Sequence, residues 1–105
     1  MNSSEKSGIA RTARVRFLTA DEGGRLTPPV SGIRSQLELG DLQTSCIVET
    51  QGTSEVLPLG EEILVSIRLL FADQSVAAFN TLVSIELFEG NKLVATGVFV
   101  PMNGE

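Results

Sequence analysis

Alternation of apolar and polar side chains is the feature of this sequence that most constrains its fold. Val15 and Phe17 alternate with Arg14 and Arg16, and residues 63–71 place apolar side chains at every second position. Successive side chains of a strand point to opposite faces, so a period of two is typical of strands with one buried face. No long stretch keeps the period of an amphipathic helix. The sequence therefore predicts an all-β domain with no helix longer than about two turns.

Glycine and proline signals divide the chain into short strands, which is typical of a small barrel or sandwich. Gly90-Asn91, between the last two strands, fits a two-residue hairpin turn, because glycine adopts a positive φ without strain. Residues 72–81 are predicted to be a linker of polar and small residues. The main strands are predicted over residues 11–19, 33–39, 44–49, 63–71, 82–88 and 92–100.

The two ends of the folded region can also be predicted. Residues 1–11 are charged and rich in serine, without a hydrophobic signal region, and we expect them to form a disordered tail. Residues 12–105 then make one folded domain. No apolar run is long enough to cross a membrane as a helix. We therefore expect a cytoplasmic protein with no membrane partner.

The absence of histidine narrows the chemistry that this chain can perform. Ser-His-Asp triads, Cys-His dyads and most zinc sites all require histidine. Cys46 is the only cysteine and lies in an apolar stretch, so we expect a buried core residue. Phosphate-binding and dinucleotide-binding glycine motifs are absent from the sequence. We expect no enzymatic activity, no catalytic residue, no metal, no cofactor and no nucleotide.

Charge is unevenly distributed along the chain. The net charge is -5, although residues 1–34 carry six basic and three acidic side chains. Neutralisation of phosphates drives the affinity of proteins for nucleic acids, so an acidic chain is a poor binder on its own. Nucleic-acid binding is therefore expected to be weak at most.

Two segments carry a motif. The first reads Leu18-Thr19-Ala20-Asp21-Glu22-Gly23-Gly24-Arg25-Leu26-Thr27-Pro28 and continues as Gly32-Ile33-Arg34-Ser35-Gln36, and the second reads Glu89-Gly90-Asn91-Lys92. At this spacing the chain resembles the third, C-terminal β-barrel domain of elongation factor Tu, over about residues 13–100. The resemblance implies a closed antiparallel barrel of about six strands, of the translation-factor C-terminal-domain type, spanning residues 12–105 as a stand-alone domain.

The resemblance also implies roles for particular residues. We expect a structural loop in which Arg25 pairs with Glu22 or bonds loop carbonyls; its members are Glu22, Gly23, Gly24, Arg25, Thr27 and Pro28. The third domain of elongation factor Tu contacts the backbone of tRNA, and its contacts fall here on Gln36, Ser45, Glu89 and Gly90. Gly40 stands where the family has an arginine, and this loss of charge disfavours phosphate contacts.

Two of the predicted strands, residues 63–71 and 92–100, carry apolar side chains on both faces. A barrel strand buries only one face, so additional apolar residues indicate a covered outer surface. The cover is either the chain's own tail, loop or bulge, or a protein partner or second copy. The function expected is a non-enzymatic binding module that engages a protein or itself, with tRNA binding as the alternative. The candidate interface residues are Leu64, Leu70, Val94 and Val98.

Overall fold

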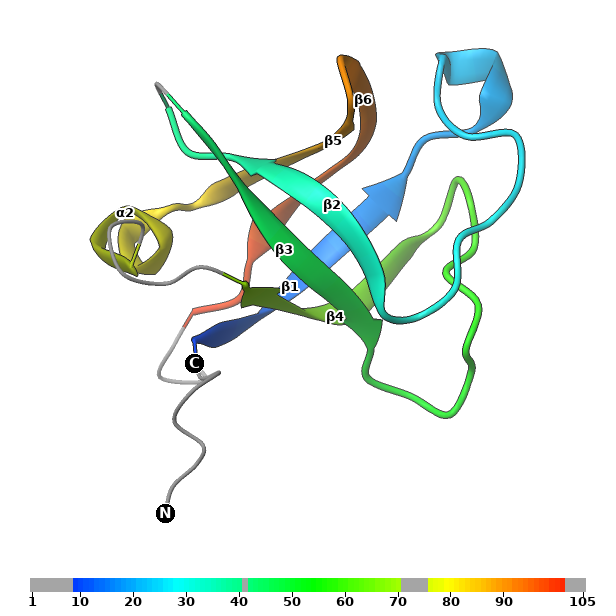
Figure 1. Cartoon of the computed structure of the whole chain (residues 1–105). Helices are drawn as coiled ribbons and strands as arrows, with labels where there is room; N and C mark the ends of the chain where they lie inside the picture. The colour runs from blue at the N-terminus through cyan, green and yellow to red at the C-terminus, as the bar shows by residue number, and fades with distance from the viewer. Residues whose placement is uncertain (1–8, 41, 71–75, 102–105) are drawn as a thin grey trace.

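Six strands form a closed antiparallel barrel (Figure 1). A computed structural model describes residues 9–40, 42–70 and 76–101. Around the barrel the order is β1-β4-β3-β2-β5-β6. This confirms the predicted fold class of an all-β, small closed barrel. The strands span Ala10–Phe17 (β1), Ile33–Glu38 (β2), Gln43–Thr50 (β3), Glu62–Leu69 (β4), Ser84–Glu89 (β5) and Lys92–Phe99 (β6).

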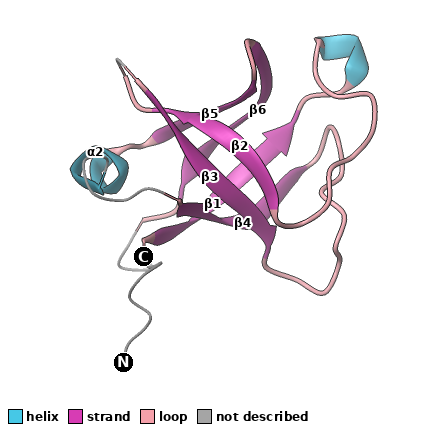
Figure 2. Ribbon diagram, viewed as in Figure 1, coloured by secondary structure: helices cyan, strands magenta, loops and turns pink. Residues whose placement is uncertain are grey.

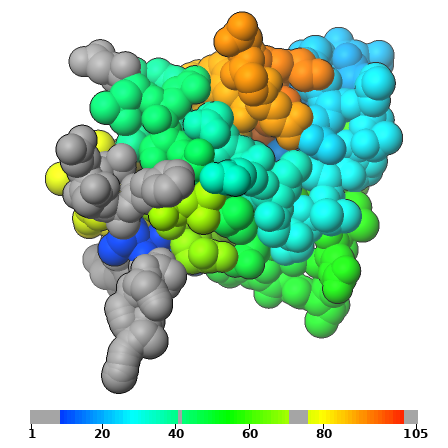
Figure 3. Space-filling model, viewed as in Figure 1, coloured from blue at the N-terminus to red at the C-terminus, as the bar shows by residue number. Residues whose placement is uncertain are grey.

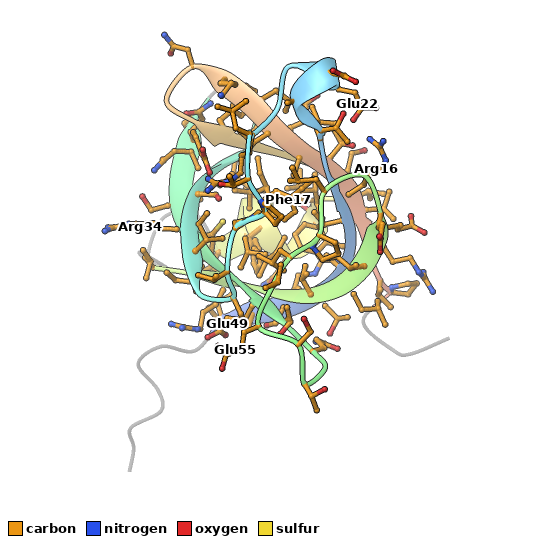
Figure 4. All side chains as sticks on the ribbon, turned by 90° about the vertical axis from the view of Figure 1, so that its right-hand side faces the viewer. Arg16, Phe17, Glu22, Arg34, Glu49 and Glu55 are labelled. Carbon is orange, nitrogen blue, oxygen red and sulfur yellow. The ribbon has the colours of Figure 1, made fainter. Side chains whose placement is uncertain are left out.

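The core lies inside the barrel and is built from the apolar face of each strand, as the alternation predicts. Ala13 and Val65 are cross-strand partners on β1 and β4, and both are fully buried. Figure 4 looks into one end of the barrel, with Phe17 at its centre. Cys46 is also fully buried, which confirms its predicted place in the core.

Two short helical segments lie at opposite ends of the barrel (Figure 2). The 3-10 helix η1 spans Ala20–Glu22, and α2 spans Val76–Thr81. Neither segment is longer than two turns, as predicted for the residues that the structure describes. These segments lack the length and apolarity that a membrane-crossing helix needs.

Helix α2 occupies the second half of residues 72–81, where a linker was predicted; residues 71–75 lie outside the described part of the chain. Its one buried residue, Phe79, packs edge-to-face against Phe99 with ring centroids 5.4 Å apart. A single apolar anchor in so short a helix shows no period, which explains why the linker prediction was wrong there.

A β-bulge between β5 and β6 changes which side of β6 faces the core. Leu87 pairs with Ala95 and Phe88 pairs with Leu93, which leaves Val94 as the extra residue. Val94 and Ala95 are neighbours in sequence, yet both are fully buried. The prediction of Val94 as an outer interface residue is therefore wrong, because it assumed uninterrupted alternation.

The barrel begins slightly earlier than predicted. Ala10 belongs to β1, one residue before the predicted strand of residues 11–19, and Arg11 belongs to it although the predicted tail of residues 1–11 also included that position. The Arg11 guanidinium donates from Nη1 to the carbonyls of Phe79 (2.6 Å) and Leu82 (2.9 Å), so it fastens α2 to β1. Residues 1–8 of the predicted tail lie outside the described residues.

Candidate interaction surfaces

The loop after β1 is held by an exposed ion pair. Arg16 donates to both carboxylate oxygens of Glu22, at 3.0 and 2.9 Å, and the Thr19 amide donates to the same carboxylate at 2.9 Å. Hydrogen bonds from Arg16, followed by that from Thr19, lower the pKa of Glu22 to about 2. Gly23 follows η1 with φ 88°, a left-handed conformation that glycine adopts without strain. Glu22 and Gly23 therefore shape the loop.

Arg25 joins this loop to the β5–β6 hairpin. Its Nε donates to the carbonyl of Thr27 at 3.0 Å, which is the loop-carbonyl alternative predicted for Arg25, and its Nη1 forms an ion pair with Glu89. Lys92 adds a hydrogen bond from Nζ to the carbonyl of Gly24 at 3.3 Å. The two segments of the sequence motif thus touch one another, and Figure 3 shows the hairpin (orange) beside the loop (cyan).

Gly24 has a further structural constraint. A Cβ at this position would lie 2.2 Å from the carbonyl oxygen of Leu18, which leaves no space for any side chain. Thr27 and Pro28, the last two members of the predicted loop, are exposed. All six motif residues therefore lie in or beside one loop, where the interactions of Glu22, Gly24 and Arg25 are with the chain itself.

The four positions implied for RNA contacts lie close together. Gln36 and Ser45 are cross-strand partners, and the Gln36 amide donates to the Ser45 hydroxyl at 3.0 Å. Gln36 also pairs with Phe88 on its other side, next to Glu89, and Gly90 begins the hairpin turn with φ 63°. The only charge among the four is the Glu89 carboxylate, which the Arg25 guanidinium neutralises. The positions gather as a group without a net positive charge.

A row of outward side chains crosses β4, β1 and β6. Arg14 on β1 pairs with Leu64 on one side and with Val98 on the other. Leu64 is 47% exposed and Val98 is 44% exposed, which is unusual for large apolar residues in the middle of a sheet. Leu70 lies just past the end of β4 and is half-buried. We call the row of Leu64, Arg14 and Val98 the outer row.

A small pocket lies beside the outer row, where the β3–β4 connection meets β4. Its volume is ≈ 230 Å³. Val56, at its wall, is 45% exposed. No prediction from the sequence covers this pocket; the apolar segment around Pro58, which belongs to no strand, was the signal for it. We call it the β4 pocket, and its lining residues are Thr50, Gly52, Ser54, Val56, Pro58, Ile63 and Leu64.

The one thiol has surroundings that suppress its reactivity. Burial raises the pKa of Cys46 to about 12, so the thiolate that acts as a nucleophile is scarcely formed at neutral pH. Among residues 9–40, 42–70 and 76–101, no three cysteine or carboxylate side chains are grouped so that they could hold a metal ion.

Comparison of the chain with models of protein families and with curated proteins finds no match.

Proposed function

We propose that this chain is a non-enzymatic binding module of the elongation factor Tu C-terminal-domain type, and that it engages a protein partner or a second copy of itself through the outer row. The observation that supports the proposal is the placement of Leu64 and Val98 on either side of Arg14, with nearly half of each apolar side chain exposed. Large apolar side chains that stay exposed on a sheet face are suited to a surface that another protein covers.

The chemistry of the outer row suits a protein interface. Complete burial of a leucine or valine side chain is worth about 1.5–3 kcal/mol, so covering the exposed halves of Leu64 and Val98 favours association. Arg14 forms no ion pair or side-chain hydrogen bond with the described residues. Arginine is enriched among residues that dominate binding energy, since its planar group can pair with a carboxylate while its stem packs on apolar neighbours.

The test combines sedimentation velocity with affinity capture on the full chain. Self-association at about 0.1 mM, or capture of a defined protein, should be lost in Leu64→Glu and Val98→Glu, because each change removes an apolar contact and places a carboxylate beside Arg14, where it competes for that guanidinium. Leu42→Glu is the matched control, since Leu42 is 55% exposed but lies at the β2–β3 turn. A monomer whose captured proteins are the same in wild type and both variants would contradict the proposal.

Binding to the backbone of tRNA is the second candidate. The observation in its favour is the grouping of Gln36, Ser45, Glu89 and Gly90 on one side of the barrel. The charge of Arg25 is already paired with Glu89 and the chain as a whole is acidic, and both disfavour contacts with phosphates. We therefore expect a Kd for tRNA no tighter than about 10⁻⁶ M at physiological salt. A gel shift at nanomolar protein that disappears in Gln36→Ala would favour RNA over a protein partner.

A further inference from the structure

We infer that the β4 pocket binds an apolar side chain of an extended peptide in which lysine or arginine flanks that side chain. This inference rests on the proposed function, because Leu64 belongs both to the outer row and to the pocket wall. It goes further in naming the chemistry of the partner. Three properties of the pocket support it: its size and lining, the backbone edge beside it, and the charge around its rim.

The size of the pocket fits one side chain. Its volume of ≈ 230 Å³ lies below the range of about 300–1,000 Å³ that is typical of pockets for drug-sized ligands and cofactors. Val56, Pro58, Ile63 and Leu64 supply an apolar lining. Val56 and Leu64 each leave nearly half of their side chain exposed there. An inserted leucine, methionine or phenylalanine would cover both residues at once.

The backbone of Val56 presents a short extended edge beside the pocket. Val56 forms an isolated antiparallel bridge with Val30, flanked by hydrogen bonds from Ser31 N to Glu55 O (2.7 Å) and from Leu57 N to Pro29 O (2.8 Å). In a bridge of this kind the N–H and C=O of Val56 point away from the paired strand.

The groups of Val56 on this edge are only weakly bonded within the chain. The exposed Ser54 hydroxyl accepts from Val56 N at 3.2 Å and donates to Val56 O at 3.3 Å, both long for hydrogen bonds. An extended peptide can pair with such an edge and place alternate side chains into an adjacent pocket. The edge thus indicates that the occupant is an extended segment.

The rim of the pocket is acidic. Glu61 and Glu62 directly precede the lining residue Ile63, and Glu55 lies between Ser54 and Val56, on the alternate face of that extended segment. All three are exposed, and none forms an ion pair with the residues that the structure describes. Figure 4 shows Glu49 and Glu55 side by side at this edge of the barrel end, with Glu49 already paired to Arg68 at 3.8 Å.

Basic groups near the rim do not cancel this charge. Arg16 is the cross-strand partner of Glu62, but it is engaged by both oxygens of Glu22. Arg14, opposite Leu64, is one cation against the two carboxylates of Glu61 and Glu62. The rim therefore stays negative, and it attracts cationic flanking residues and repels anionic ones.

Three matched tripeptides test the inference by NMR titration of the ¹⁵N-labelled full chain. They are acetyl-Lys-Leu-Lys-amide, acetyl-Gly-Leu-Gly-amide and acetyl-Glu-Leu-Glu-amide, each at millimolar concentration. The lysine peptide should shift the amide signals of Gly52, Ser54, Val56 and Leu64. Its Kd should be about fivefold lower than that of the glycine peptide, and the glutamate peptide should have the highest Kd of the three. Equal binding of all three, tighter binding of the glutamate peptide, or shifts confined to another face would overturn the inference.

Two kinds of variant separate the pocket from its rim. The triple variant Glu55→Gln, Glu61→Gln and Glu62→Gln should remove the preference for lysine while the glycine peptide binds as before. Leu64→Ala should weaken all three peptides, and its spectrum shows independently whether the barrel is intact. Leu42→Ala and Glu86→Gln are the controls, because both residues are exposed and lie away from the pocket. A lysine preference that survives the triple variant would contradict the role of the rim.

The outcomes distinguish the inference from the proposed function. If the peptides fail to bind while Leu64→Glu and Val98→Glu still abolish association, the pocket inference is wrong and the outer row stands. If the lysine peptide binds while those variants change neither association nor capture, the outer row is wrong and the pocket stands. If the pocket amides shift with protein concentration alone, a second copy occupies the pocket, and the peptide assignment is wrong.

Discussion

Arg11 shows how one side chain can link parts of the chain that are distant in sequence. Its guanidinium donates to two carbonyls at the C-terminal end of α2, and its Cζ lies 4.0 Å from the centroid of the Phe99 ring. Burial lowers the pKa of Arg11 below its usual value, although arginine stays charged at any ordinary pH. A cation at a helix C-terminus also complements the helix dipole. Arg11 thus holds α2, β1 and β6 together.

We predict that Arg11→Ala destabilises the barrel by about 2 kcal/mol. Hydrogen bonds from a charged donor are worth about 1.5–3 kcal/mol, and the contact with Phe99 adds to them. Urea unfolding at equilibrium measures the change. Arg34→Ala, at an exposed arginine on β2, is the control and should change stability by less than about 0.5 kcal/mol. Equal stability of the two variants would show that the Arg11 contacts carry no net free energy.

Glu22 gives a prediction that depends on pH. Its pKa is about 2 in the folded chain and 4.5 in the absence of these contacts, so its carboxylate stabilises the fold above about pH 4.5. This stabilisation is lost as the pH falls through the folded value near 2. The stability difference between wild type and Glu22→Gln should therefore be largest near neutral pH and shrink progressively between pH 4.5 and 2.

Urea unfolding at several pH values checks the Glu22 prediction. Glu55→Gln controls for the loss of one negative charge, because Glu55 forms no ion pair with the described residues. A difference between wild type and Glu22→Gln that stays constant down to pH 2 would mean that the Arg16 pair contributes nothing to stability.

At the scale of elements, β1 and β6 approach so closely that one position on β6 accepts only glycine. A Cβ on Gly97 would lie 2.1 Å from the carbonyl oxygen of Arg14 and 2.9 Å from the Cα of Val15. Both atoms belong to the backbone of β1, which cannot move without disturbing the ladder. Gly97 therefore sets the spacing between these strands.

We predict that Gly97→Ala destabilises the barrel by about 1–3 kcal/mol, the usual cost of excess volume in a packed region. Gly52→Ala is the matched control, because a Cβ there meets no atom within 4 Å. Thermal and urea unfolding of both variants provide the measurement. A Gly97→Ala chain as stable as Gly52→Ala would show that β1 and β6 separate at little cost.

The strands with the longest alternation of apolar and polar residues were the easiest to predict from the sequence. β1 and β4 each extend over enough residues for alternation to identify both the strand and its buried face. Alternation cannot show the bulge that buries Val94. Both faces of β6 are apolar, so a one-residue shift in register leaves no trace in the pattern of apolar and polar residues. Helix α2 was missed because its stability comes from Phe79 and the distant Arg11, and not from a local period.

The candidate surfaces were predictable only in part, for a related reason. The exposure of Leu64 and Val98 follows from their strand phase, and the sequence identified both. The β4 pocket depends on how the β3–β4 connection folds back against Val30, which is a contact between irregular segments. Such segments have no period from which their neighbours can be inferred.

At the scale of the whole molecule, Cys46 reports on the opening of the barrel. Because burial hides the thiol and raises its pKa to about 12, we predict that iodoacetamide modifies it only when the barrel opens. The labelling rate in native buffer should be at least about a hundredfold below that in denaturant, consistent with an opening free energy of several kcal/mol. Mass spectrometry over time provides the measurement. Rapid labelling in native buffer would mean that β3 separates easily from its neighbours.

The ladder between β2 and β5 has a consequence for the folding pathway. Only two residue pairs, Gln36 with Phe88 and Leu37 with Leu87, join these strands, whereas seven pairs join β1 to β4. Closing the ring at its shortest ladder gains the fewest contacts, so we expect closure to be the last step of folding. Leu87→Ala should then speed unfolding and leave the folding rate nearly unchanged, with a φ-value below about 0.3. Val65→Ala, within the long β1–β4 ladder, should slow folding instead, and stopped-flow measurements across a range of urea concentrations would separate the two.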